Sequence, residues 1–259
     1  AYLALKAGLP PRQHDYVSKI HAAARSLLGI LNDILDFSKI EAGKVALEAV
    51  PFDLEQVVQN ALFMVQQKAE GKRIELIVDF EPTRNLHHLV GDPLRLGQIL
   101  INLLSNAVKF TEVGHVRLSV RQQACDGGVS TIAFRVEDTG IGMTPEQVGR
   151  LFQEFSQADG ATTRKYGGTG LGLAISKRLL SAMNSEILVE SAVDRGSVFH
   201  FAVQLPLAPG SAAAGDDKSL SGCHRVLVVD DHLAVRESMA EMLLAMGCGA
   251  VDQSPGGED

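Results

Sequence analysis

Three polar side chains recur at helical spacing in the segment Asn102-Leu-Leu-Ser-Asn106-Ala-Val-Lys109. Because positions i, i+4 and i+7 fall on one side of an α-helix, the spacing predicts a polar stripe of two amides and one ammonium group. Magnesium takes a few oxygen ligands beside phosphate oxygens, and an asparagine supplies such an oxygen without a charge that would repel a triphosphate. The stripe therefore indicates a site for Mg²⁺ and phosphate, and the alternative is a helix whose polar side meets water.

A second candidate segment, Asp138-Thr-Gly140-Ile-Gly142, follows a strand-like run. Its glycines allow another group to approach the backbone closely, and its carboxylate can accept a hydrogen bond from an exocyclic amine such as that of adenine. The same spacing is also an ordinary strand-to-turn signal, so this segment alone leaves both interpretations open.

The third segment is Gly167-Gly-Thr-Gly170-Leu-Gly172, which runs into an apolar helical pattern. Backbone N–H groups at the start of a helix suit a phosphate group. A tight turn and a dinucleotide fingerprint are the alternatives, although neither a preceding strand nor a downstream acid supports the fingerprint. The polar stretch from Ser156 to Gly168 has few apolar anchors, and we expect it to form a mobile lid.

The elements around these segments mix helices and strands. Helical periodicity occurs at 53–70, 93–110 and 171–183, and strand-like runs occur at 73–80, 115–123, 131–137, 186–191 and 198–205. Because the strands come largely as antiparallel neighbours, we predict an α+β fold, in which helices cover one face of a mixed sheet and the other face is solvated.

The two ends of the chain differ from this central region. From Gln13 to Ile40, apolar residues form a heptad-like stripe that predicts one helix of a helical hairpin, with Gly8 to Pro11 as the turn. An amphipathic helix on a globular domain is the alternative. Residues 206–222 are small and polar and indicate a linker. A short strand from Arg225 to Val229 and a helical pattern through Leu244 follow it.

In their order and spacing, the three segments together resemble the nucleotide-binding boxes of the Bergerat-type fold, and in particular those of the histidine kinases. Asn102–Lys109 resembles the N box, Asp138–Gly142 the G1 box, Leu151–Phe155 the F box and Gly168–Gly172 the G2 box. The resemblance covers nearly the whole chain. It implies a Bergerat-fold α/β sandwich over 47–207, preceded by the end of a dimerisation helical hairpin over 1–46 and followed by a linker over 208–222 and a partial receiver domain over 223–259.

The resemblance also implies the roles of single residues, with ATP and Mg²⁺ as cofactors. Asn102, Asn106 and Lys109 would be catalytic, and Asn106 would bind the Mg²⁺ that accompanies ATP. Asp138 would bind the adenine amine, a lid cation (Arg164 or Lys165) the phosphates, and Phe152 and Phe155 would secure the lid. The remaining residues expected to contact ATP are Gly140, Gly142, Gly168, Thr169, Gly170, Leu171 and Gly172.

The family resemblance favours a kinase over its rivals. Related ATPases carry a glutamate as general base where this chain has Asn102, and an amide cannot take a proton from water. A kinase needs no such base, because an imidazole nitrogen attacks the γ-phosphorus directly and catalysis consists mostly of positioning and charge neutralisation. The rivals are a slow ATPase of the same fold and a kinase-like scaffold that binds nucleotide without transferring phosphate.

The phosphoryl acceptor of the family is a histidine followed by an acid, with a proline five residues on. None of the eight histidines has this context; His14 precedes Asp15, but position 19 is lysine. We therefore expect this chain to be a fragment whose acceptor helix lies before Ala1 and whose receiver aspartate lies beyond Asp259. Asp230 and Asp231 resemble the paired receiver acids that bind Mg²⁺, and a charged strand end is the alternative.

Composition limits the partners. The formal net charge of −7 disfavours duplex DNA, and three widely spaced cysteines speak against a disulfide framework and a zinc site. We expect a homodimer through the helical hairpin, and transfer to the receiver and to downstream phosphotransfer or response-regulator proteins. No apolar run is long enough to span a membrane. We therefore expect this portion to be cytoplasmic, while anchoring of a longer protein in the inner membrane is left open.

The family pattern is broken at two turns. Its Gly-Gly before the penultimate strand is Asn184-Ser185 here, and its G-x-G before the last strand is Asp194-Arg195-Gly196. We expect both turns to differ slightly from those of the family.

Overall fold

The computed structural model describes residues 2–6, 9–41, 46–80, 86, 88–153, 170–209 and 224–256. Its centre is a five-stranded sheet in the order β2 (Glu75–Phe80), β4 (His115–Asp126), β5 (Val129–Asp138), β7 (Gly196–Pro206) and β6 (Leu188–Ala192). β2 pairs with β4 in parallel, and the other neighbours are antiparallel. The mixed sheet confirms the predicted α+β fold.

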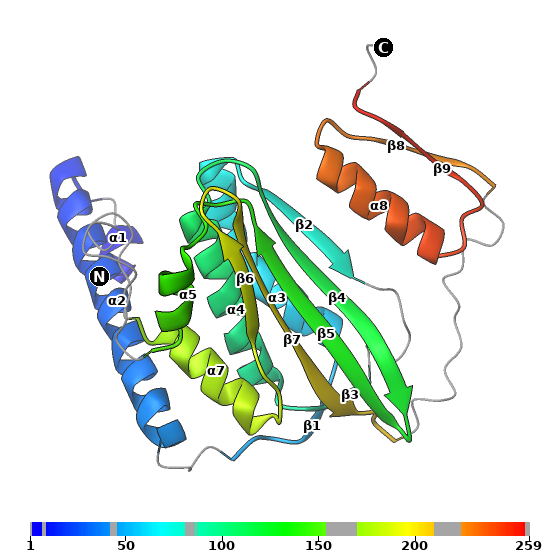
Figure 1. The fold of residues 1–259 in the computed structure, drawn as a ribbon. Helices are drawn as coiled ribbons and strands as arrows, with labels where there is room; N and C mark the ends of the chain where they lie inside the picture. The colour runs from blue at the N-terminus through cyan, green and yellow to red at the C-terminus, as the bar shows by residue number, and fades with distance from the viewer. Residues whose placement is uncertain are drawn as a thin grey trace.

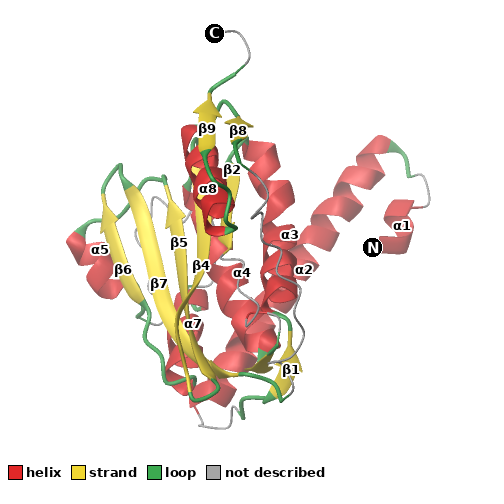
Figure 2. Cartoon of the chain, turned by 90° about the vertical axis from the view of Figure 1, so that its right-hand side faces the viewer, coloured by secondary structure: helices red, strands yellow, loops and turns green. Residues whose placement is uncertain are grey.

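Helices α3 (Leu54–Lys72), α4 (Pro93–Phe110) and α7 (Gly172–Ala182) cover one face of the sheet, as Figures 1 and 2 show. Residues alternate along each strand, so one face of β4 presents Val116, Leu118 and Val120 to the core while the other presents Arg117 and Arg121. All three central helical stretches and all five strand-like runs expected from the sequence correspond to elements of this layer. The short elements β1 (Val50–Phe52), β3 (Leu89–Gly91) and α5 (Pro145–Arg150) were not predicted.

The helix ends follow their local sequence. Asp53 and Asp92 are the N-caps of α3 and α4, and the Asp92 carboxylate accepts from the Arg95 N–H at 3.0 Å. Pro93 occupies the first turn of α4, where it has no intrahelical donor to lose. At α5, Thr144 and Gln147 form a reciprocal capping box.

The two turns that break the family pattern keep a glycine-like backbone. Asn184 and Asp194 adopt φ values of 55° and 59°, in the left-handed region. Asparagine and aspartate enter this region more readily than most side chains because their short polar groups bond locally. Both turns therefore adopt a left-handed backbone at a residue other than glycine.

The flanking parts of the chain lie on different sides of this layer. The long helix α2 (Pro11–Glu41), which follows α1 (Tyr2–Lys6), packs against α7 on the helical side. Toward the end of the chain, β8 (Val226–Val229) and β9 (Val251–Ser254) form a parallel pair with α8 (Leu233–Ala245) between them in sequence. In Figure 2, α8 lies in front of the open face of the sheet. No helix among the described residues combines the length and apolarity needed to cross a bilayer.

We predict that Lys72 stabilises the end of α4 that carries the polar stripe. Its Nζ donates to the carbonyl oxygens of Val108, Lys109 and Thr111 at 2.8 to 2.9 Å, and a cation there also complements the helix dipole. Lys72→Met should lower the free energy of unfolding by about 1 to 2 kcal/mol in urea denaturation. Lys68→Met, at an exposed site one turn earlier in α3, is the matched control, and equal losses in both variants would contradict this role.

Candidate nucleotide site around helix α4

The polar stripe predicted from the sequence lies along α4, opposite its buried side. Asn102, Asn106 and Lys109 are half-buried, whereas seven apolar residues of the same helix are buried. The apolar set consists of Leu96, Ile99, Leu100, Leu103, Leu104, Ala107 and Val108. Packing of this set on the sheet therefore directs the stripe away from the sheet.

The first residue of the stripe joins α4 to α7. Asn102 donates its amide to the Ser176 hydroxyl at 2.9 Å, and a side chain at Gly172 would collide with the Asn102 amide. Ser176 is buried and lies one turn after Gly172 in α7. The sequence analysis missed Ser176, although its i+4 spacing from Gly172 places both on the same side of the helix.

The second residue, Asn106, has an oxygen suited to a metal ion. Its amide nitrogen donates to Asn102 Oδ1 at 3.4 Å, a long contact that turns the Asn106 oxygen away from Asn102. Within the described part of the chain, no three His, Cys, Asp or Glu side chains cluster as metal ligands. This donor set fits Mg²⁺ that is held by one protein oxygen together with phosphate oxygens and water, which is how this ion is commonly bound beside phosphates.

The third residue, Lys109, ends the stripe beside the aromatic ring of Phe110. Its Nζ lies 4.7 Å from the ring centroid, within cation–π range. Burial lowers the pKa of Lys109 below its ordinary value. The ammonium group is thus partly desolvated, which strengthens its attraction for an anion such as a phosphate.

The end of α4 also meets the segment around Asp138. The carbonyl oxygen of Phe110 accepts from the Ile141 N–H at 3.3 Å, and a side chain at Gly140 would strike this carbonyl. Gly142 adopts a φ of 62°, and a side chain there would strike the Ala192 carbonyl. The two glycines of this segment are therefore required by close backbone contacts, as their spacing predicted.

Asp138 is a buried carboxylate at the end of β5. Its Oδ1 accepts from the Gly140 N–H at 2.9 Å. Burial raises the pKa of Asp138, and hydrogen bonds from the Gly140 and Ser197 backbone only partly oppose this effect. A buried carboxylate whose pKa is raised chiefly by desolvation is a typical feature of a binding site, and a donor such as an exocyclic amine would satisfy it.

The remaining predicted site residues fall in two groups. Phe152 packs against the core, and Lys177 Nζ of α7 lies 5.3 Å from its ring centroid. Leu171 is buried, Gly170 adopts a φ of 70°, and α7 begins at Gly172 without a side-chain cap hydrogen bond from Leu171. Five other predicted residues lie outside the described residues: Phe155, Arg164, Lys165, Gly168 and Thr169.

The acid pair lies far along the chain from this site. Asp230 Oδ1 accepts from the His232 N–H at 2.8 Å, and the Asp230 carbonyl oxygen accepts from Arg236 at 2.6 Å. Asp231 is exposed. The two acids thus stand at the end of β8, the position that the receiver resemblance implied.

Comparison with known proteins gives two family matches. Residues 91–209 match the family described as histidine kinase-, DNA gyrase B- and HSP90-like ATPase, and residues 2–43 match the His Kinase A (phospho-acceptor) domain. Sensor histidine kinase GacS of Pseudomonas protegens is 43% identical over 93% of this chain, and signal transduction histidine-protein kinase BarA of Escherichia coli K12 is 37% identical over 93%. This chain spans 26% of the length of each.

Among solved structures, the crystal structure of full-length ShkA in complex with AMPPNP is similar to this chain, with a TM-score of 0.77 and 30% identity. The alignment covers 96% of this chain and 50% of that protein. Such a share cannot be reached without part of 224–256, so the similarity includes residues from this last described range.

We predict that burial of Asp138 makes the fold less stable at neutral pH than it would be with an amide there. Because the folded-state pKa of Asp138 is above the unfolded-state value, the folded state holds the proton more tightly. Stability therefore falls as the pH rises from the unfolded-state pKa through the folded-state pKa. Asp138→Asn should raise the urea midpoint at pH 7. This gain should shrink as the pH falls and should level off below the unfolded pKa, where both states are protonated. If the unsubstituted chain were more stable than Asp138→Asn at pH 7, the raised pKa of Asp138 would be contradicted.

Proposed function

Because this chain belongs to the hybrid sensor histidine kinase family, we propose that it is the nucleotide-binding core of an enzyme that phosphorylates a histidine with ATP. The γ-phosphoryl group would pass to a histidine on the dimerisation helix and then to a receiver aspartate. The observation that carries the proposal is the convergence on α4 of segments far apart in sequence: Asn102 bonds Ser176 of α7, and Phe110 bonds Ile141 of the Asp138 segment.

Each polar group in this arrangement has one task. Asp138 accepts a hydrogen bond from the adenine amine, and the close backbone contacts of Gly140 and Gly142 fix the segment that carries this carboxylate. Asn106 offers an oxygen to Mg²⁺, which neutralises charge on the phosphates when it is bound. Lys109 contacts the phosphates as a cation. Asn102 holds α7 in register with α4 and supplies no base, which suits direct attack by an imidazole.

The helix α2 supports assembly as a homodimer. Its described residues present a row of exposed apolar side chains, namely Ile20, Leu27, Leu28, Leu31, Ile34 and Leu35. A contiguous apolar surface of this kind is typical of a protein–protein interface, and the row follows the heptad-like stripe of the sequence. A second copy of α2 with its hairpin partner would cover it.

The segment order 1–46, 47–207, 208–222 and 223–259 then corresponds to dimerisation hairpin, catalytic domain, linker and receiver segment. Asp230 and Asp231 would contribute to a receiver Mg²⁺ site. Response regulators or phosphotransfer proteins would be the downstream partners. Since the reaction consumes ATP, we place this portion in the cytoplasm.

We predict that ATP binding depends on Asp138 and that its magnesium dependence depends on Asn106. Asp138→Asn should weaken ATP about tenfold to hundredfold, the value of one hydrogen bond to a charged group. Asn106→Ala should make the affinity insensitive to Mg²⁺. Titration calorimetry with and without Mg²⁺ measures both, with Asn60→Ala on the exposed side of α3 as the control. Unchanged affinity in both site variants would refute the assignment.

We predict that this chain binds ATP without phosphorylating itself, because none of its eight histidines has the acceptor context. A nucleophile must lie within roughly 3 to 3.5 Å of the γ-phosphorus. After incubation with radiolabelled ATP, acid-labile and base-stable label should be absent from the chain alone. It should appear when a separate first-helix segment with the acceptor histidine is added. Label on the chain alone would contradict the prediction.

A further inference from the structure

The side of the sheet opposite the core helices contains a buried apolar residue that the core does not explain. On β2, Leu76, Val78 and Phe80 pack against the hydrophobic core, and the alternate residues Ile77 and Asp79 point to the other side. Ile77 is nevertheless only 4% exposed and does not belong to the core cluster. Something on the open face must cover it, and α8 is the element that packs against β2.

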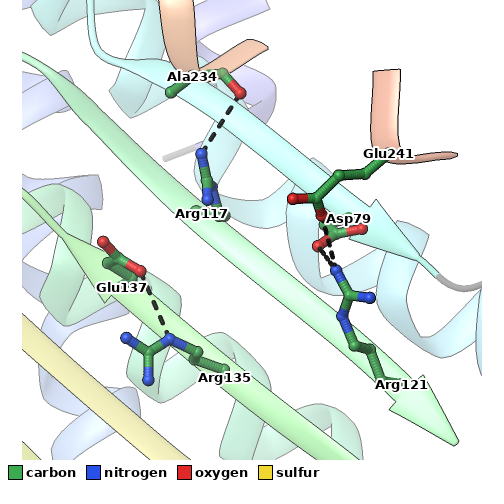
Figure 3. Close-up of polar contacts among 7 residues, drawn as sticks. All are labelled: Asp79, Arg117, Arg121, Arg135, Glu137, Ala234 and Glu241. Carbon is green, nitrogen blue, oxygen red and sulfur yellow. Dashed lines mark hydrogen bonds and ion pairs between the residues drawn. The ribbon is translucent and has the colours of Figure 1, made fainter. Parts of the chain in front are cut away.

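Two arginines of β4 contact α8, as Figure 3 shows. Arg121 lies between the two elements, 2.7 Å from the Asp79 carboxylate of β2 and 3.0 Å from the Glu241 carboxylate of α8. Both carboxylates raise the pKa of Arg121. Arg117 donates to the Ala234 carbonyl oxygen at 3.3 Å.

The contacting positions follow one side of α8. Ala234, Ser238 and Glu241 are spaced by four and three residues, so they lie on the same side of the helix, and Ser238 is buried. At the start of the helix, the ring of His232 meets the ring of His115 of β4 edge-on, with centroids 5.3 Å apart. Contacts therefore run along α8 from its first turn to Glu241.

We propose that the open face of the sheet is a docking surface for the receiver segment 224–256, with α8 as the docking element. The receiver identity of this segment rests on the proposed function; the docking itself rests on the burial of Ile77 and on the arginine contacts.

The chemistry of the interface predicts weak, reversible docking. Arg121 and Glu241 are more than half exposed, and an ion pair of this kind contributes little. The interface also buries Arg117 Nε and His232 Nδ1 without a hydrogen-bond partner, at a cost for each atom. The burial of Ile77 is the favourable term that offsets these costs, so single substitutions should be enough to release α8.

The test is hydrogen exchange of the α8 amides in the whole 259-residue chain. Glu241→Arg places a second cation beside Arg121 and should speed hydrogen exchange of the α8 amides about fivefold. Glu237→Arg reverses the same charge at an exposed position of the same helix and should leave exchange unchanged. Equal effects of the two substitutions would overturn the proposal.

A second variant changes only the sheet, so that any effect on α8 cannot come from the sequence of the helix. Ile77→Asp buries a carboxylate while α8 is docked and should speed α8 exchange at least tenfold, because burial of an isoleucine is worth about that factor or more. Ala133→Asp, on the same face of β5, is its control. Unchanged α8 exchange in Ile77→Asp would refute docking. ATP affinity, measured in parallel, reports on the proposed nucleotide site alone, so that failure of the site and failure of docking remain distinct.

Discussion

The packing of α4 against both the sheet and α7 is the constraint on which the candidate site depends. One side of the helix is apolar and fully buried, and the other carries two asparagines and a lysine that are half-buried. A polar side chain at that depth costs free energy unless it is hydrogen-bonded, and Asn102 is bonded to Ser176. The same close approach of α7 requires glycine at position 172, opposite the Asn102 amide. The packing of α4 on α7 thus also sets the positions of the polar side chains of the candidate site.

The sequence predicts local geometry well where the backbone dictates residue type. Gly140, Gly142 and Gly172 are recognisable because a side chain at each would collide with a neighbouring group. The amphipathic period of α4 places the stripe correctly, because burial of its apolar side leaves no other orientation. Partners far apart in sequence are harder to predict. Ser176 and Lys72 act through contacts with α4 that depend on tertiary packing, and the local sequence does not identify the residues they contact.

The fold was predictable to a similar extent. The strands of the sheet alternate between apolar and polar residues because one face packs on helices, and this period is visible in β4 and β5. The short strands β1 and β3 were not predicted, because three residues are too few to show the alternation of apolar and polar side chains. The turns at Asn184 and Asp194 show why the absence of a glycine does not exclude a left-handed turn. The backbone at both residues is left-handed, and asparagine and aspartate can adopt this conformation as well as glycine.

The strands of the sheet contact the core helices on one face and α8 on the open face. An antiparallel sheet with one solvated face should carry polar residues there, and β4 and β5 do, through Arg117, Arg121, Arg135 and Glu137. Ile77 departs from this pattern, and Asp79 beside it is almost fully buried, yet both lie on the face where helices of the core are absent. Since isolated charges are seldom buried, Asp79 needs Arg121, and Arg121 in turn reaches Glu241. The burial of Ile77 and Asp79 on β2 is therefore explained only when α8 is included.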